Sequence, residues 1–435
     1  MFRRIIKPFT ALFFSGLLLA ACGDTPVPPA PTGMALEIGE SSASVTWDMQ
    51  PGVEYWLWYA PKSVAPTTTD LSRGWAGLPG GNVMMRVSSP ATAVGLTNGL
   101  EYVFTLNAHK DGGPGGPGAA FITATPRLAG ATWSTVTTPL NSAARLRAAV
   151  FGTVYVSAGE AGALVTSSDG KTWTTGSSNT LNNLNAAAYV SDYRIVGDNG
   201  TIITSADAIT WTAQTSVTAE NLYGIATNSA GFSVAVGAKG TILTSADGAN
   251  WTKVASSGTS RDLNAVVYTT INNGLWLAVG AAGTMLKSPD AITWTPLAAP
   301  VAGTDLSGVD LRSASFGVLP LATGQLIGTN ALVVVGSAGT LLSSNDGSTW
   351  SVRTPPSVAA NGSALSLSGV RWNSVVYGSQ FIAAGTAGNI ITSTDGITWS
   401  AASVPSTATQ DLAKVARGSL SYWAVGATAN VLRSK

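Results

Sequence analysis

The chain has 435 residues, with 23 Lys or Arg against 22 Asp or Glu, so its formal net charge is +1 and only 10% of it is charged. A near-neutral chain has no long-range field to attract phosphate backbones, so nucleic acid is not an expected partner. The sequence holds one His and one Cys, too few for a Ser-His-Asp triad, a Cys-His pair, a zinc site of His and Cys ligands or a disulfide. No metal ion or cofactor is indicated.

Residues 1–21 have the pattern of a secretory signal peptide. Basic residues at positions 3, 4 and 7 precede an apolar stretch from Phe9 to Ala20, which is shorter than the ~20 residues that a membrane-spanning helix needs. The stretch ends in Leu19-Ala20-Ala21-Cys22, which resembles the bacterial lipobox. The resemblance implies that Cys22 is lipidated and anchors the mature protein in a membrane. Asp24 does not follow Cys22 directly, which favours the outer membrane; the alternative is an ordinary signal with a chance Cys.

Residues 22–31 then predict a tether, because four Pro in the eight residues 24–31 favour an extended chain. Residues 32–127 show short alternating strands separated by Gly and Pro turns, a pattern typical of a β-sandwich. Seven strands are expected, at 33–38, 43–49, 54–61, 83–88, 92–96, 101–110 and 119–124. This pattern resembles a fibronectin type III module, on the strength of Pro31-Thr32-Gly33, Trp47 and the run from Leu96 to Tyr102.

The third of these strands is apolar on both faces. If Tyr55, Leu57 and Tyr59 point into the core, alternation leaves Trp56 and Trp58 outside on one face. Such aromatics could stack on a sugar ring or dock onto a neighbouring domain. The alternative is that the module itself or the loop 63–78 covers them.

An internal repeat fills residues 128–435. Six segments share the pattern Ser-x-Asp-(Gly/Ala)-x-(Thr/Asn)-Trp, with the acidic residues Asp169, Asp207, Asp247, Asp290, Asp346 and Asp395 and the aromatic residues Trp173, Trp211, Trp251, Trp294, Trp350 and Trp399. The pattern resembles the Asp-box, or BNR repeat, of β-propeller proteins. Ahead of each box an apolar strand ends in Gly-x-x-Gly, and the first glycines of seven successive units are 38 to 56 residues apart. A four-stranded propeller blade takes ~40 to 45 residues.

The seventh unit stops before a box of its own, at Lys435. The segment Gly130–Val136 matches the fourth strand of the other units and has no unit before it. We therefore expect an all-β protein in which a seven-bladed β-propeller is closed by this N-terminal strand, leaving no long open sheet edge.

Each box is expected to turn the third strand of a blade into the fourth, a structural rather than catalytic role. The Asp would accept hydrogen bonds from backbone N–H groups, the Gly would supply permissive dihedrals, and the Trp would pack between blades. Ala208 and Ala291 replace the Gly in two boxes. If that position needs positive φ, each would cost about 1 kcal/mol, and the two turns should be weaker or differently shaped.

Asp-box propellers include the sialidases, which resemble one another in an arginine triad, a Tyr-Glu pair, an acid Asp and an Arg-Ile-Pro motif. This propeller has two glutamates, Glu160 and Glu220, and no Arg-Ile-Pro. Glu160 falls in a Gly-x-x-Gly turn, which leaves Glu220 near Tyr223. We therefore expect no enzyme, with a sialidase-like or other glycan-acting hydrolase as the alternative.

The repeat unit as a whole resembles the propeller of the photosystem II assembly and stability factors and their relatives in non-photosynthetic bacteria, over residues 129–435. The resemblance implies a protein that binds partners without doing chemistry. A fibronectin module is not part of that family's usual plan, so a photosynthetic role is not implied.

Loops that enter the inner strands usually form the binding face of a propeller. The residues before the Leu that starts each expected inner strand are Arg145, Asn183, Asn221, Asp262, Asp305, Ser366 and Asp411, and those after it are Arg147, Asn185, Tyr223, Asn264, Ser307, Ser368 and Ala413. With Arg261 and Arg371 they predict a polar ring that could hold a peptide or a glycan, and its three Asp could attract Ca²⁺ if they converge. The alternative is that these residues only open strands as turn formers.

Two segments exceed the repeat length and are expected to carry specificity. They are Arg312 to Asn330, between the first and second strands of the fifth unit, and Thr354 to Leu365, which leads into the sixth. The function we expect is that of a non-catalytic cell-envelope lipoprotein whose propeller binds a protein or glycan partner, in an adhesion, scaffold or assembly role. A largely structural surface component is a further alternative.

Overall fold

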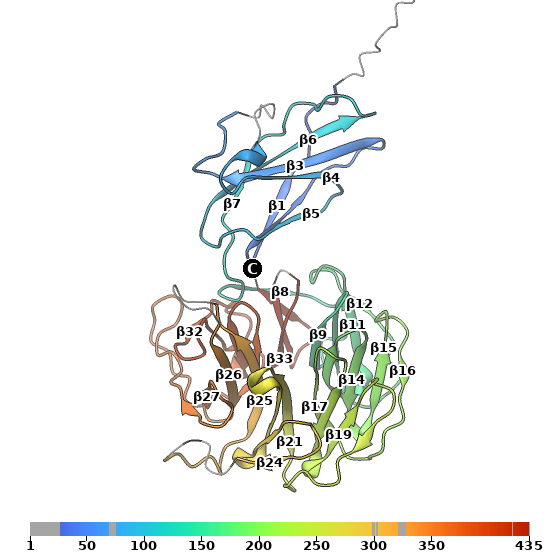
Figure 1. The fold of residues 1–435 in the computed structure, drawn as a ribbon, viewed down its shortest axis with the longest axis vertical. Helices are drawn as coiled ribbons and strands as arrows, with labels where there is room; N and C mark the ends of the chain where they lie inside the picture. The colour runs from blue at the N-terminus through green and yellow to red at the C-terminus, as the bar shows by residue number, and fades with distance from the viewer. Residues whose placement is uncertain are drawn as a thin grey trace, which may run out of the picture. The chain divides into compact units, whose positions relative to one another are not determined.

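The computed structural model describes residues 27–68, 75–297, 301, 303–320, 328–419 and 421–434. The expected signal peptide and Cys22 lie outside this part of the chain. The chain divides into two compact units, one made mostly of residues up to Thr125 and one that holds every residue from Pro126 onward (Figure 1). Among the described residues, no helical segment has the length and apolar character needed to span a bilayer.

Two sheets form the first unit. One has the order β1 (Ala35–Gly39), β2 (Ser42–Thr46), β5 (Ala91–Val94), and the other β4 (Asn82–Val87), β3 (Val53–Pro61), β6 (Tyr102–Lys110), β7 (Ile122–Ala124). A short 3-10 turn, η1 (Trp75–Gly77), precedes β4. The seven strands match the expected ranges to within a few residues, while the relationship to fibronectin type III modules stays a prediction.

Seven four-stranded sheets form the second unit and follow one another in chain order as blades (Figure 1). The first three are β9 (Leu146–Phe151), β10 (Tyr155–Gly159), β11 (Leu164–Ser167), β12 (Thr174–Thr175); β13 (Leu184–Tyr189), β14 (Tyr193–Gly197), β15 (Ile202–Ser205), β16 (Thr212–Ala213); and β17 (Leu222–Thr227), β18 (Ser233–Gly237), β19 (Ile242–Ser245), β20 (Thr252–Lys253). The next three are β21 (Leu263–Thr269), β22 (Leu275–Gly280), β23 (Met285–Ser288), β24 (Thr295–Pro296); β25 (Leu311–Val318), β26 (Asn330–Gly336), β27 (Leu341–Ser344), β28 (Ser351–Val352); and β29 (Trp372–Tyr377), β30 (Phe381–Gly385), β31 (Ile390–Ser393), β32 (Ser400–Ala401). The last consists of β33 (Leu412–Arg417), β34 (Tyr422–Gly426), β35 (Val431–Ser434) and β8 (Trp133–Val136).

The pairing of β8 with β35 closes the ring. Val136 lies opposite Val431 and Trp133 opposite Ser434 in an antiparallel ladder, and β33 of the seventh blade lies beside β9 of the first. This confirms the predicted seven-bladed propeller and its closure by an N-terminal strand. The buried Trp133 donates its indole N–H to the carbonyl oxygen of Gly130 at 2.7 Å, which fixes the entry of the closing strand.

The Gly-x-x-Gly pattern marks a tight turn after the second strand. In five blades this turn is a 3-10 turn: η2 (Glu160–Gly162), η3 (Asp198–Gly200), η4 (Ala238–Gly240), η6 (Ala281–Gly283) and η7 (Thr386–Gly388). A 3-10 turn of another kind, η5 (Ile271–Asn273), joins the first strand of the fourth blade, β21, to its second, β22. A Cβ on Gly197 would lie 2.0 Å from the carbonyl oxygen of Asn183, and Gly200 has a φ of +67°. The first glycine therefore lets the turn approach the start of the inner strand, and the second permits its backbone conformation.

Each Asp-box joins the third strand to the fourth through the same hydrogen bonds. Asp290 Oδ1 accepts the backbone N–H groups of Ile292 (2.8 Å) and Thr293 (2.7 Å) and the hydroxyl of Ser288 (2.9 Å). The corresponding bonds recur in the other five boxes, and all six box Trp side chains are buried. The box residues therefore hold the fold together.

Ala208 and Ala291 adopt φ of 62° and 64°, the left-handed conformation of the Gly in the other four boxes. The position does need positive φ, and the two turns are not differently shaped around the Asp, because both boxes keep the two backbone N–H bonds to its carboxylate. Ala208 belongs to one buried cluster with Val156 of the preceding blade, and Ala291 to another with Val234, so both methyl groups are buried in the apolar packing between blades. That the two turns are weaker stays a prediction.

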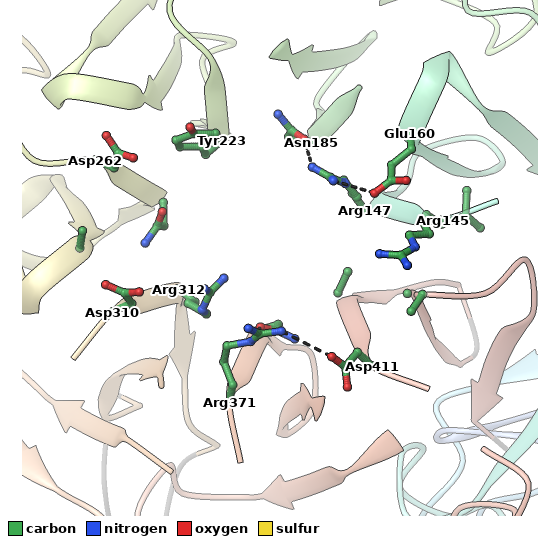
Figure 2. A pocket seen from close by; sticks show the side chains of 17 residues that line it. Arg145, Arg147, Glu160, Asn185, Tyr223, Asp262, Asp310, Arg312, Arg371 and Asp411 are labelled. Atoms are coloured by element: carbon green, nitrogen blue, oxygen red, sulfur yellow. Dashed lines mark hydrogen bonds and ion pairs between the residues drawn. The ribbon is translucent and has the colours of Figure 1, made fainter. Parts of the chain in front are cut away.

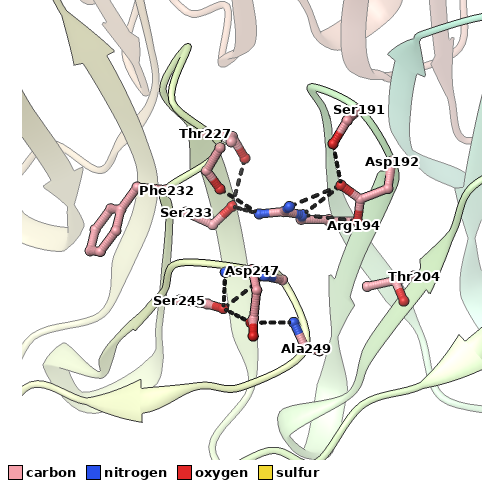
Figure 3. A network of polar contacts seen from close by, with 12 residues as sticks. Ser191, Asp192, Arg194, Thr204, Thr227, Phe232, Ser233, Ser245, Asp247 and Ala249 are labelled. Atoms are coloured by element: carbon pink, nitrogen blue, oxygen red, sulfur yellow. Dashed lines mark hydrogen bonds and ion pairs between the residues drawn. The ribbon is translucent and has the colours of Figure 1, made fainter.

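The box of the third blade faces an arginine instead. Arg194 of β14 is buried and donates to the carboxylate of Asp192 (2.9 Å), the carbonyl oxygen of Gly231 (2.8 Å) and Ser233 Oγ (2.7 Å), which joins the second blade to the third (Figure 3). A Cβ on Gly248 would lie 2.4 Å from Arg194 Nε. Glycine is therefore required here by the neighbouring side chain as well as by φ.

We expect the Asp-boxes to make the propeller sensitive to acid. The backbone N–H groups of Thr293 and Ile292 lower the pKa of Asp290 from 3.8 to about 2. A carboxylate whose pKa is lower in the folded state stabilises the fold above about pH 4 and loses that contribution as the pH falls towards 2. Replacing Asp290 by Asn should therefore reduce the free energy of unfolding by about 1 kcal/mol at pH 7 and by less at pH 2, as measured by urea unfolding. An equal loss at both pH values would contradict this account.

Candidate functional site

The starts of the inner strands surround a cavity of about 580 Å³, which we call the channel mouth (Figure 2). Its charged lining residues are Arg145, Arg147, Glu160, Asp262, Asp310, Arg312, Arg371 and Asp411, and its uncharged polar ones are Asn185, Tyr223, Asn264 and Asn373. Four arginines and four carboxylates share one cavity, so the channel mouth is densely charged but formally neutral.

The residue that precedes each inner strand has a structural task in five blades. Its side-chain oxygen accepts a hydrogen bond, at 2.9 to 3.4 Å, from the backbone N–H of the middle residue of the turn in the preceding blade. The five residues that do so are Asn183, Asn221, Asp262, Asp310 and Asp411. In the other two blades this position holds Arg145 and Arg371. A guanidinium has no acceptor and cannot make this bond, so these two residues depart from the structural pattern.

The second residue of the inner strands shows a similar pattern. Asn185, Asn264 and Asn373 donate their amide N–H to the backbone carbonyl that opens the next inner strand, at 2.7 to 3.0 Å. The other four blades carry Arg147, Tyr223, Arg312 and Ala413 at this position. Three of these four are large side chains that do not make the inter-blade bond and line the channel mouth instead.

Two of the four arginines are neutralised within the channel mouth. Arg147 pairs with Glu160 at 2.7 Å and bonds Asn185, and Arg371 pairs with Asp411 at 3.4 Å (Figure 2). Neither Arg145 nor Arg312 takes part in an ion pair with any described residue (Figure 2).

The guanidinium of Arg312 is partly buried in the channel mouth and has an unused donor. Its Nε atom is buried and has no hydrogen-bond partner among the described residues. Burial lowers the pKa of Arg312, the positive charge of Arg371 lowers it further, and Asp310 opposes both. Arginine stays protonated in proteins, so the channel mouth holds a partly desolvated cation with an unused donor, an arrangement that favours an anionic ligand.

The structure brings together most of the residues that the sequence predicts for the polar ring. Of the sixteen predicted residues, the nine that line the channel mouth are Arg145, Arg147, Asn185, Tyr223, Asp262, Asn264, Arg371, Asp411 and Ala413. The seven that do not line it are Asn183, Asn221, Arg261, Asp305, Ser307, Ser366 and Ser368. Arg261 donates to the carbonyl oxygen of Ala282 at 2.9 Å, and the carboxylate of Asp305 accepts the backbone N–H of Ser307 at 2.8 Å.

The error at Asp305 arises from the register of two inner strands. The fifth blade begins its inner strand at Leu311 rather than Leu306, and the sixth at Trp372 rather than Leu367. Residues 312–318 therefore belong to β25, and the extra segment of the fifth blade starts only after Val318. This register explains why Asp310, Arg312 and Asn373 were missed from the sequence. Glu160 was missed because it lies in a Gly-x-x-Gly turn, and the structure places this turn against the cavity.

One signal could have placed the sixth inner strand. In the first and second blades the opening Leu pairs with the Gly that lies 13 residues later. Trp372 lies at the same distance from Gly385, with which it pairs. The long segment between β25 and β26 hides the same signal in the fifth blade.

The predicted aromatic pair Trp56 and Trp58 belongs to the first unit. Both side chains are half-buried rather than exposed. Trp56 stacks on His109 with ring centres 4.1 Å apart, and the indole N–H of Trp58 donates to Asn107 Oδ1 at 2.9 Å. Because this bond fixes the amide of Asn107, its N–H group faces His109 Nε2 at 3.2 Å, and His109 must accept there. Contacts within the module thus occupy much of this surface.

The described residues contain no group of three or more His, Cys, Asp or Glu side chains placed to hold a metal ion. Asp262 and Asp411 line the channel mouth while Asp305 does not, so the three Asp considered for Ca²⁺ do not converge there.

The channel mouth also differs from a sialidase-like nucleophile site. Glu220 pairs with Lys239 at 3.0 Å and does not line the cavity, whereas Tyr223 does. A tyrosine nucleophile needs a base within hydrogen-bond reach, and among the described residues no carboxylate bonds the Tyr223 hydroxyl. Glu160, the glutamate in the cavity, is held by Arg147 instead.

No protein-family model and no curated protein matches the sequence. Solved structures resemble the structure of this chain. YCF48 from Cyanidioschyzon merolae is 18% identical with a TM-score of 0.50, over 70% of this chain and 98% of that one. YCF48 bound to D1 peptide is 16% identical with a TM-score of 0.52, over 69% and 94%. The RRP9 WD40 repeats are 8% identical with a TM-score of 0.53, over 70% and 98%. At these identities the likeness shows the fold, and it defines this chain as a β-propeller protein.

Proposed function

We propose that this protein is a non-catalytic binding protein of the cell envelope, whose channel mouth binds a segment of a protein partner that carries carboxylate groups. One observation carries the proposal. At the positions where the other blades use Asn or Asp for bonds between blades, the channel mouth places Arg145, Arg147, Arg312 and Arg371, and two of these arginines have no ion-pair partner among the described residues. Charged side chains that make no structural bond between blades and line the cavity are suited to bind a ligand of opposite charge.

A protein ligand is favoured over a glycan by the chemistry of the lining. Among the described residues that line the cavity, Tyr223 is the one aromatic side chain, whereas arginines and amides dominate. Sugars are usually held by stacking on aromatic rings, and carboxylates by arginine. The solved complex of YCF48 with a D1 peptide supports a peptide ligand for a propeller of this fold.

The address rests on the N-terminal sequence. Lipidation of Cys22 would anchor the chain in the outer membrane, and the Pro-rich residues 24–31 would space the folded units from the lipid. Labelling cells with a palmitate analogue should mark the wild-type protein and leave the Cys22→Ser variant unmarked and soluble in the envelope extract. Equal labelling of both would contradict the anchor.

A peptide-display selection on the full chain tests the binding proposal. The enriched peptides should contain Asp or Glu, should compete with one another, and should lose affinity when those residues become Asn or Gln. Enrichment of neutral peptides, or no enrichment at all, would overturn the proposal.

A glycan-acting hydrolase is the second candidate, because arginines and carboxylates do meet in one cavity. It predicts turnover of a model glycoside that falls when Glu160 is changed to Gln. Binding of acidic peptides without such turnover would exclude it in favour of the proposed function.

A further inference from the structure

The connection between the fifth and sixth blades is the longest between any two blades. It comprises residues 353–371, between β28 and β29, whereas the connection between β12 and β13 comprises only residues 176–183. Within it, residues 357–365 form a small hairpin, closed by an antiparallel bridge between Val358 and Ala364, which we call the connecting hairpin. An ordered connection of this length is usually functional, because a rigid fold needs only a short one.

A cavity of about 230 Å³ lies between the connecting hairpin and the outer strands of the sixth blade. Its lining includes three buried aliphatic side chains, Leu367, Ile390 and Ile391, each at most 3% exposed. Asn361 of the hairpin and Ser403 of the blade also line it and are exposed. The cavity therefore has an aliphatic floor and a polar rim. An apolar cavity of ~150 Å³ already has room for a molecule as large as benzene.

The two walls of this cavity are held in place by different contacts. On the side of the blade, the backbone N–H of Ser403 donates to the carbonyl oxygen of Ala131 at 2.8 Å, and its carbonyl oxygen accepts the N–H of Trp133 at 2.9 Å. On the side of the hairpin, Leu365 packs partly buried against the core cluster of the sixth blade. The cavity is thus formed by the fold itself, as ligand pockets usually are.

The cavity and the channel mouth lie at the two ends of the η7 turn. Arg371 lines the channel mouth, and its carbonyl oxygen accepts the N–H of Thr386, the first residue of η7, at 3.1 Å. Asn389, directly after η7, lines the cavity and donates its side-chain N–H to the carbonyl oxygen of Thr386 at 2.9 Å. A 3-10 turn rises ~2 Å per residue, so Thr386 and Asn389 are ~6 Å apart. An extended peptide covers that distance in about two residues, and the side chain of Arg371 reaches further into the channel mouth.

We propose that this cavity is a second subsite for the partner segment and binds an aliphatic side chain of Leu, Ile or Val size. That side chain lies about three to five residues from the acidic residue bound at the channel mouth, at ~3.3 Å per extended residue. The identity of the occupant rests on the proposed function. The polar rim of Asn361 and Ser403 favours a peptide over a free hydrocarbon, because a peptide backbone offers groups that bond to it.

Fluorescence anisotropy with a peptide selected on the full chain tests the subsite. The enriched peptides should carry an aliphatic residue at a fixed distance from the acidic one. Replacing that residue by Ser should weaken binding to the wild type about tenfold or more, because its burial contributes to affinity. In the Leu365→Ser variant, which removes an apolar wall, the two peptides should differ by at most about threefold.

The matched control is Val358→Ser. Val358 is 53% exposed on the same hairpin and is not among the described residues that line the cavity, so this variant should discriminate between the two peptides as the wild type does. A second measurement needs no variant of the protein. A peptide with photo-leucine at the aliphatic position should cross-link the wild type within residues 359–367 or 389–404.

An uncharged probe separates this subsite from the arginines of the channel mouth. N-acetyl-leucinamide has no carboxylate and should shift the methyl NMR signals of Ile390 and Ile391. If no acidic peptide is selected but the probe shifts these signals, the proposed function fails and the aliphatic site stands. If acidic peptides bind, the subsite is overturned by a Ser peptide that binds as tightly as its parent, by photo-leucine cross-links confined to other segments, or by a Leu365→Ser variant that discriminates like the wild type.

Discussion

The Arg312→Asn variant is expected to bind a selected acidic peptide at least tenfold more weakly than the wild type, with no loss of stability. Arg312 offers a partly desolvated guanidinium with an unused donor, and loss of one member of a buried charge pair costs about 2 to 5 kcal/mol in affinity. Asn is the residue that blades two, four and six carry at this position, where it bonds the next inner strand. The substitution should therefore add about 1 kcal/mol to the free energy of unfolding.

Fluorescence anisotropy with the peptide and urea unfolding measure the two effects separately. Arg417→Asn, at the other end of β33 from the channel mouth, is the matched control and should change neither the affinity nor the stability by much. Unchanged affinity in Arg312→Asn would remove Arg312 from the site. A loss of more than about 2 kcal/mol in stability would show that its role is in the fold.

Gly248→Ala is expected to destabilise the propeller by about 3 kcal/mol. The position has a φ of +78°, and the new methyl group would lie 2.4 Å from the Nε of the buried Arg194. Positive φ alone costs an alanine about 1 kcal/mol, and Ala208, which has a φ of 62° in the box of the second blade, shows that the fold tolerates this cost. The larger part of the loss should therefore come from displacement of Arg194 and its bonds to Asp192 and Ser233 (Figure 3).

A double-mutant cycle separates the two causes. Arg194→Ala should itself cost about 3 kcal/mol, because it leaves the Asp192 carboxylate without its partner. In that background Gly248→Ala should cost only the backbone term, so the two substitutions should be less than additive by at least about 1 kcal/mol. Strict additivity in urea unfolding would mean that the two residues do not act on each other.

The repeats made the propeller predictable from the sequence. Six Asp-boxes and the glycine spacing of seven units predicted the number of blades, and Trp133 and its neighbours supplied the one strand that the seventh unit lacked. Local hydrogen bonding explains this success, because each box uses only residues within the turn.

The channel mouth was less predictable, because its residues are set by register between blades. The opening residue of the sixth inner strand is Trp372 rather than a Leu, and the segment after Val318 obscures the distance from Leu311 to Gly336. The register shows which residue occupies each of these positions. An Asn or Asp there bonds a neighbouring blade, as Asn264 does, whereas an arginine there faces the cavity. Some residues of the ring therefore form turns and others face the cavity as candidates for binding. The sequence alone left these two roles as alternatives for the whole ring.

Photo-cross-linking of a selected acidic peptide to the full chain tests most directly whether the channel mouth is the binding face. A peptide with a photoreactive group beside its carboxylate should cross-link, by mass spectrometry, to residues at the starts of the inner strands such as Tyr223 and Asn264. The cross-links should disappear in the Arg312→Asn variant. Cross-links confined to the box turns, around the exposed Ile209 and Ile292, or to Trp56 and Trp58 of the first unit would contradict the account.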